Sequence, residues 1–187
     1  SFGTDVIPEV GDIIASAYCK DNTVVFTTPE TFREGNALIA AIDASNDILW
    51  SWHIWCTAEG YEEQVYANNA GTMMDRNLGA VSATPGDVGA LGLLYQWGRK
   101  DPFLSSSAIN EMIHPMSTIT WPEEIESTSS TGTVEYATKH PTTSISGKNV
   151  TEEQTPGYFY ITSDWMYNSP YNFLWKSVKT VYDPCPH

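Results

Sequence analysis

The amino-acid sequence predicts an α+β fold made of antiparallel β-hairpins, one main helix and long irregular loops. Residues 48–57 alternate between two faces with the period of a half-buried strand. Residues 88–99 carry apolar side chains at helical spacing, and residues 105–156 are rich in Ser, Thr, Pro and Gly. The length of 187 residues fits one domain with a sizeable core.

The first 36 residues predict two short strands between turns. β-prone side chains fill residues 12–18 and residues 23–28, and Pro29 stops the second stretch. We expect these strands to be a short segment at the end of a preceding region, separate from the fold that starts at residue 37.

Residues 37–43 and 48–57 predict the two arms of a hairpin, joined by the polar turn Asp43–Asp47. Calcium would accept the oxygen atoms of that turn, but hairpin turns favour the same residue types, so we interpret it as a plain turn and expect no metal. In the second arm the two faces are Ile48, Trp50, Trp52, Ile54 and Cys56, and Leu49, Ser51, His53, Trp55 and Thr57.

The middle of the chain predicts a strand, a helix and then loops. Residues 71–79 fit a short strand that runs into a turn. Asp87 offers an N-cap for a helix over residues 88–99, whose glycines indicate close backbone packing onto another element. Residues 105–156 have few apolar side chains, so we expect long surface loops and binding contacts there.

Charge and hydropathy exclude two classes of partner. The chain has 23 Asp and Glu against 9 Lys and Arg, a net charge of −14, so the phosphates of a nucleic acid would be repelled. The longest apolar run, residues 37–42, is far shorter than the roughly 20 residues of a membrane span. We expect no nucleic-acid partner and no membrane span in this chain.

Signatures of catalysis are lacking in the sequence. The HExxH, GxSxG, SxxK, GxGxxG and Walker A patterns are absent, and the glutamate clusters lie in polar stretches that are typical of solvated surface. His53 and Cys56 are three apart on a strand, which places them on opposite faces and disfavours a nucleophile pair. We expect no enzymatic activity and no cofactor.

Three cysteines leave their oxidation state open. Cys19, Cys56 and Cys185 form no CxxC pair and no cluster with His, which argues against structural zinc. A Cys19–Cys56 disulfide and three free thiols are equally compatible with the sequence. In an exported protein Cys185 would need a partner outside this chain.

Two clusters around scarce cations are candidate structural staples. Arg76 and Arg99 lie within the most apolar part of the sequence, and a buried guanidinium must pair with a carboxylate or with several carbonyls. We interpret both clusters as polar staples that join strand, turn and helix, with binding of an anionic ligand as the alternative. The residues concerned are Asp75, Arg76, Asn77, Arg99 and Asp101.

Aromatic side chains are concentrated in residues 158–175, which hold eight of them. Such a segment either closes the core or presents flat faces on which a ligand can stack. The candidates for ligand contact are Trp121, Tyr158, Tyr160, Trp165 and Tyr167.

Three blocks together resemble the Fibrobacter succinogenes major paralogous domain, which also occurs in fimbrillin-like surface proteins and lipoproteins of Bacteroidota. The blocks are MDRNLGA at residues 74–80, GLLYQWGRKDPF at residues 92–103 and YDPCP at residues 182–186. Residues 48–55 are similar to the strand that precedes the core of the fimbrillin-associated versions, so the resemblance covers most of residues 30–187.

The resemblance implies a fold similar to C-type lectins and formylglycine-generating enzymes, a mixed domain with a small twisted antiparallel sheet preceded by a short β-hairpin region. It also implies that residues 37–187 are an incomplete domain whose C-terminal half is another piece of the same polypeptide. The reactive cysteine pair of the enzymatic relatives is not matched, so no activity is carried over.

The resemblance favours an extracellular protein at the outer-membrane surface. Our first hypothesis is a non-enzymatic binding or adhesion module of fimbrial or lipoprotein type, which recognises a glycan, a surface protein or other pilus subunits. The alternatives are a carbohydrate-active or cysteine-dependent enzyme on the same fold, and a purely structural spacer.

Overall fold

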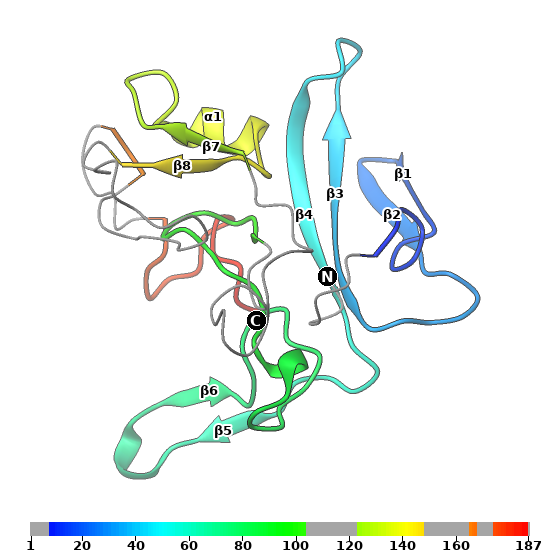
Figure 1. Ribbon diagram of the computed structural model, residues 1–187, viewed down its shortest axis with the longest axis vertical. Helices are drawn as coiled ribbons and strands as arrows, with labels where there is room; N and C mark the ends of the chain where they lie inside the picture. The colour runs from blue at the N-terminus through cyan, green and yellow to red at the C-terminus, as the bar shows by residue number, and fades with distance from the viewer. Residues whose placement is uncertain (1–7, 104–122, 148–164, 168–173, 187) are drawn as a thin grey trace.

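The computed structural model describes residues 8–103, 123–147, 165–167 and 174–186, and these form an α+β fold of short sheets (Figure 1). Strand pairs β1–β2, β3–β4 and β5–β6 are antiparallel, and β7–β8 is parallel. The elements are β1 (Ser16–Lys20), β2 (Thr23–Thr27), β3 (Gly35–Ile42), β4 (Ile48–Cys56), β5 (Glu63–Val65), η1 (Ala67–Asn69), β6 (Thr72–Met74), η2 (Val88–Ala90), β7 (Glu124–Glu126), α1 (Val134–Lys139) and β8 (Ser144–Ser146).

The first hairpin confirms two strands near the N-terminus but moves the first of them along the chain. β1 begins at Ser16 and continues to Lys20, whereas the sequence predicted residues 12–18. Asp21 and Asn22 form the connection, and both have positive φ, of 50° and 60°. Two-residue turns of this kind match the twist of antiparallel strands, so the turn fixes the register of the pair.

The long hairpin β3–β4 is confirmed and lies between the β1–β2 hairpin and the segment with β7, α1 and β8 (Figure 1). Its register pairs Leu38 with His53, and a β-bulge interrupts the pairing between Ala41 and Ile42. In the connecting turn, Asp43 Oδ1 accepts hydrogen bonds from the backbone N–H groups of Ser45 at 2.8 Å and Asp47 at 2.9 Å. The carboxylate therefore caps its own turn, as short polar side chains do in Asx turns.

A third hairpin, β5–β6, extends away from the other elements (Figure 1). The strand expected in residues 71–79 is confirmed as β6, but its partner β5 lies in a polar stretch with no strand pattern. All three residues of β5 are exposed, so no apolar alternation was present to indicate it.

The helix predicted over residues 88–99 is wrong. After Asp87, whose carboxylate accepts the N–H of Gly89 at 2.9 Å as an N-cap, only one 3-10 turn forms. Gly92 and Gly98 have φ of 73° and 83°, a left-handed conformation that ends a right-handed helix. A Cβ at Gly92 would lie 2.7 Å from the carbonyl oxygen of Leu78, so the expected close backbone packing does occur here.

The prediction of continuous surface loops over residues 105–156 is also wrong for residues 124–146. There β7, α1 and β8 form a parallel strand–helix–strand unit, which lies on one side of the long hairpin (Figure 1). Ser127, Thr143 and Ser144 are buried in this unit. Buried hydroxyl groups are tolerated when they are hydrogen-bonded, as Ser127 Oγ is to the Trp165 carbonyl at 2.7 Å, so a Ser- and Thr-rich segment can belong to a core.

A cluster of buried apolar side chains lies between this unit and the C-terminal segment. Tyr136, Trp175 and Tyr182 pack around it. Its buried members are Ala137, Ile145, Trp165, Met166 and Leu174.

We predict that Gly92→Ala destabilises the protein more than Gly86→Ala. Gly86 has a similar φ of 85°, but a Cβ there would meet nothing within 4 Å. Gly86→Ala should therefore cost about 1–2 kcal/mol for the left-handed backbone alone, and Gly92→Ala about 2–4 kcal/mol because steric overlap adds to it. Urea unfolding of both variants measures the difference, and equal losses would contradict the packing argument.

Candidate functional site

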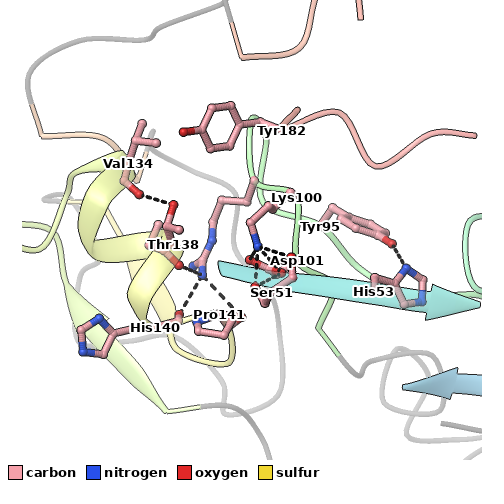
Figure 2. Close-up of polar contacts among 12 residues, drawn as sticks. Ser51, His53, Tyr95, Lys100, Asp101, Val134, Thr138, His140, Pro141 and Tyr182 are labelled. Carbon is pink, nitrogen blue, oxygen red and sulfur yellow. Dashed lines mark hydrogen bonds and ion pairs between the residues drawn. The ribbon is translucent and has the colours of Figure 1, made fainter. Parts of the chain in front are cut away.

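A short turn, Gly98–Asp101, projects charged side chains in two directions. Gly98 has a positive φ, and a Cβ there would lie 3.0 Å from Leu174 Cδ1, which explains why glycine occupies this position. Arg99 extends toward the end of α1, where it binds the His140 carbonyl. Lys100 and Asp101 instead meet Ser51 on β4 (Figure 2). The turn therefore connects the helical unit with the long hairpin.

The guanidinium of Arg99 binds backbone carbonyl groups at the C-terminal end of α1. Nη1 donates to Thr143 O at 2.7 Å, and Nη2 donates to His140 O at 3.0 Å and Ala137 O at 3.4 Å. The last carbonyls of a helix lack partners within the helix, and a cation near them is favourable. Arg99 thus caps a helix that is 38 to 41 residues distant in the chain.

Burial of Arg99 is nearly complete, with only 3% of the residue exposed. Its Cζ lies 5.0 Å from the ring centre of Phe103 and 5.8 Å from that of Trp165. Burial lowers the pKa of Arg99 to about 10, partly offset by Asp101, so the side chain stays charged at neutral pH. Among the described residues its Nε has no hydrogen-bond partner, so the guanidinium is held through Nη1 and Nη2.

Lys100, Asp101 and Ser51 form a second buried cluster on β4. Lys100 Nζ lies 2.8 Å from both carboxylate oxygens of Asp101, donates to Ser51 O at 3.0 Å and also contacts Ser51 Oγ. Ser51 Oγ in turn donates to Asp101 Oδ1 at 2.7 Å. The ammonium also lies 4.5 Å from the ring centre of Trp50. The pair is therefore neutralised and hydrogen-bonded, as a buried ion pair must be.

A serine beside a lysine can form a nucleophile pair, but the geometry here favours a structural role. Ser51 is only 1% exposed, so a substrate would not reach its Oγ. Burial lowers the pKa of Lys100, and the hydrogen bond to Asp101 offsets only part of this shift. The contacts of Nζ with Ser51 and Asp101 hold it inside a buried cluster.

Next to this cluster, His53 joins β4 to two other segments, and Figure 2 shows its contact with Tyr95. Its Nδ1 lies 3.0 Å from Tyr95 Oη and its Nε2 lies 2.8 Å from Asn36 Oδ1. The amide of Asn36 donates to Gly79 O at 2.7 Å, so its Oδ1 is the acceptor and His53 carries its proton on Nε2. Burial lowers the pKa of His53 to about 4 and raises that of Tyr95, so both groups stay uncharged at neutral pH.

The cluster of Asp75, Arg76 and Asn77 connects the end of the β5–β6 hairpin to the 3-10 helix η2. Arg76 makes a bidentate pair with Asp75, with Nε to Oδ1 at 2.9 Å and Nη2 to Oδ2 at 2.8 Å, and both side chains are 11% exposed. The hydrogen bond from Arg76 lowers the pKa of Asp75. Asn77 donates to the carbonyl groups of Ala90 and Leu91, both at 3.3 Å.

The aromatic ligand candidates are only partly described. Trp121, Tyr158 and Tyr160 lie outside the described residues. Trp165 is 3% exposed and donates its indole N–H to Trp97 O at 2.7 Å, so its selection as a ligand contact is corrected: the ring is part of the core. Tyr167 is at the surface, and its backbone N–H donates to Gly132 O at 3.0 Å.

An exposed tryptophan that the sequence analysis did not select lies beside the core. Trp97 is 56% exposed, and its ring centre is 5.0 Å from that of Trp175. The indole N–H of Trp175 donates to Tyr182 O at 2.8 Å, and its ring centre lies 6.4 Å from that of Tyr95. Trp97 therefore rests on a ring that is held in place, and we call Trp97 and Trp175 the tryptophan platform.

All three cysteines are free thiols in the structure, with Cys56 buried and Cys19 and Cys185 exposed. Burial raises the pKa of Cys56 and of Cys185, which disfavours their reactive thiolate forms. In the part of the chain that the structure describes, no group of three or more His, Cys, Asp or Glu side chains could hold a metal ion.

Comparisons of this chain with protein-family models, with curated proteins and with solved structures find no match. The resemblance described above and the lectin-like scaffold that it implies therefore stay predictions. Within the described residues, no helix combines the length and the apolar composition that crossing a membrane requires.

We predict that Arg99→Lys destabilises the protein by about 3 kcal/mol, because a single ammonium cannot satisfy all the carbonyl groups that Nη1 and Nη2 bind together. Arg33→Lys is the matched control, since the side chain of Arg33 is 55% exposed and its ion pair with Asp12 is 3.6 Å long. That change should cost less than about 0.5 kcal/mol. Thermal unfolding of both variants measures the contrast, and similar losses would refute the role of Arg99.

We predict that stability falls as the pH decreases from 6.5 to 4 through the titration of His53. The pKa of this group drops from 6.5 to about 4 on folding, so in this window the unfolded chain binds the additional proton. Because the unfolded chain binds this proton more tightly, the free energy of unfolding decreases by up to about 3 kcal/mol across the window. His53→Gln should be less stable at pH 7 but lose less over this window, as urea unfolding at several pH values can measure. A variant with the same pH slope as the native chain would count against this assignment.

Proposed function

We propose that the chain is a non-enzymatic binding or adhesion module of a surface protein of fimbrial or lipoprotein type, exposed at the outer membrane. In this proposal it has a lectin-like scaffold and recognises a glycan, another surface protein or a pilus subunit. The resemblance of residues 74–80, 92–103 and 182–186 supports the class of protein. The exposed tryptophan platform is the observation that carries recognition.

The tryptophan platform has the properties of a recognition site. Large aromatic side chains provide much apolar area with few rotatable bonds, so little conformational entropy is lost when a partner binds. The backbone of Trp97 is fixed by the hydrogen bond from Trp165, and Trp175 is fixed by its bond to Tyr182. Sugar rings stack on such flat faces, and tryptophan is also enriched at the energetic centres of protein interfaces.

Internal bonding of the titratable groups favours recognition over chemistry. His53 uses both ring nitrogens in bonds to Tyr95 and Asn36, and the donors of Lys100 are directed at Ser51 and Asp101. A general acid or base needs a free proton position within reach of a substrate. These groups are instead used to join segments of the fold.

The test is glycan binding by the intact protein, measured on a glycan array and then as a dissociation constant for the best glycan. Trp97→Ala should weaken binding by at least about ten-fold, or about 1.4 kcal/mol, because the stacking face is lost. Trp97→Tyr should keep most of the affinity. Tyr18→Ala is the control, since Tyr18 is 54% exposed but lies on β1.

Two results would contradict the glycan proposal. If the native chain binds no glycan, glycan recognition is excluded and a protein partner is the remaining form of the proposal. Equal binding by Trp97→Ala and Tyr18→Ala would show that the tryptophan platform is not the site.

A further inference from the structure

A cavity of about 490 Å³ lies between the N-terminal segment and the long hairpin. This volume falls within the roughly 300–1,000 Å³ that is usual for small-molecule sites. Most of its walls come from residues 8–17, which include the start of β1, from residues 36–39 of β3, and from the region of Leu93 and Phe103. His53 of β4 and Thr142 complete the lining. No part of the function proposed above uses this cavity.

The walls of the cavity are mainly apolar. Ile13 and Phe103, both nearly fully buried residues, lie on it together with Leu38, Ile39 and Leu93. An apolar lining of this kind favours an apolar occupant.

Two polar side chains on the lining, His53 and Asn36, are already committed to bonds within the protein. His53 is held between Tyr95 and Asn36, and the amide of Asn36 donates to Gly79 O. His53 is uncharged at neutral pH and presents no cation to a ligand. No lysine or arginine is among the lining residues.

Charge near the cavity disfavours an anionic ligand. Glu9 lies on the lining, and Asp12, whose carboxylate accepts the Glu9 N–H at 3.0 Å, is close by. Arg33 lies 3.6 Å from Asp12 in an exposed ion pair, and the chain as a whole carries a net charge of −14. A carboxylate or phosphate group would therefore meet repulsion without a paired cation.

The walls are also held in place before any ligand arrives. β3 is paired with β4 along its whole length, and Asn36 and Leu38 share one face with the paired residues Trp55 and His53. Phe103 is anchored by two backbone bonds with Leu94, of 2.8 and 3.1 Å. A preformed apolar site spares the ligand the cost of ordering its own pocket.

We propose that this cavity binds an uncharged, mainly apolar small molecule of the size of a medium-chain alcohol. The volume, the apolar walls, the committed polar groups and the nearby carboxylates together point to this class. The site is separate from the tryptophan platform, so it adds a second binding activity and does not depend on the first.

The experiment uses the full chain and the uncharged fluorescent dye Nile red, displaced by decanol or by decanoate at pH 8. We expect decanol to displace the dye and decanoate to bind at least about ten-fold more weakly, because the two ligands differ chiefly in charge. Equal binding of the two would overturn the assignment of an uncharged ligand.

Two matched variants locate the site. Leu38→Trp places a larger side chain on the lining and should weaken decanol binding by at least about ten-fold. Leu49→Trp makes the same change at a residue that is 56% exposed on β4 and should leave binding unchanged. Equal binding by both variants would overturn the proposal.

A measurement on the native chain keeps the test valid if Leu38→Trp does not fold. Methyl resonances of Ile13, Ile39 and Leu93 should shift on addition of decanol, whereas those of Ile42 and Leu49 should not. Shifts confined to Ile42 and Leu49, or binding of an extended apolar peptide with no binding of decanol, would overturn the proposal.

Discussion

The buried guanidinium of Arg99 is the constraint on which the arrangement of the helical unit depends. An uncompensated charge in a protein interior is strongly unfavourable, so the carbonyl groups that receive its protons must be assembled whenever the chain is folded. Those carbonyls belong to the end of α1 and to the segment that enters β8. Gln96 adds a second link, because its Nε2 donates to Ile145 O at 2.8 Å.

On the other side of the turn, the buried charge of Lys100 is also compensated by its partners. Its ammonium and the carboxylate of Asp101 are buried against β4, where Ser51 is bonded to both. The turn begins at Gly98, which adopts a backbone conformation that other residues rarely accept. A four-residue turn thus joins two units that have few other polar links among the described residues.

Features that depend on residues close together in the sequence were predictable, whereas features that depend on contacts between distant residues were not. The β3–β4 hairpin was predictable because alternation and turn residues are local signals. The scarcity of cations singled out Arg76 and Arg99, but a sequence does not state which carbonyls a guanidinium will meet. The helix predicted over residues 88–99 does not form, because Gly92 and Gly98 adopt positive φ although the apolar spacing is helical.

Burial of individual side chains was the least predictable property. Trp165 and Trp97 are alike in type, yet one is in the core and the other is exposed, because exposure depends on tertiary packing. Ser51 and His53 lie on the face of β4 that seemed the more polar, and their partners are on residues 36, 95, 100 and 101. Only one local signal was available for them, namely polar residues inside an otherwise apolar strand.

Tyr95 lies between the two surfaces for which binding is proposed. Its hydroxyl meets His53 on the lining of the cavity, and its ring contacts Trp175 of the tryptophan platform. Coupling between two sites requires an element with two arrangements that both ligands bias. Tyr95 is fixed at its hydroxyl by a hydrogen bond and at its ring by packing, so it gives neither ligand a second arrangement to favour. The geometry therefore supports independent binding at the two proposed sites, although Tyr95 lies next to both His53 and Trp175.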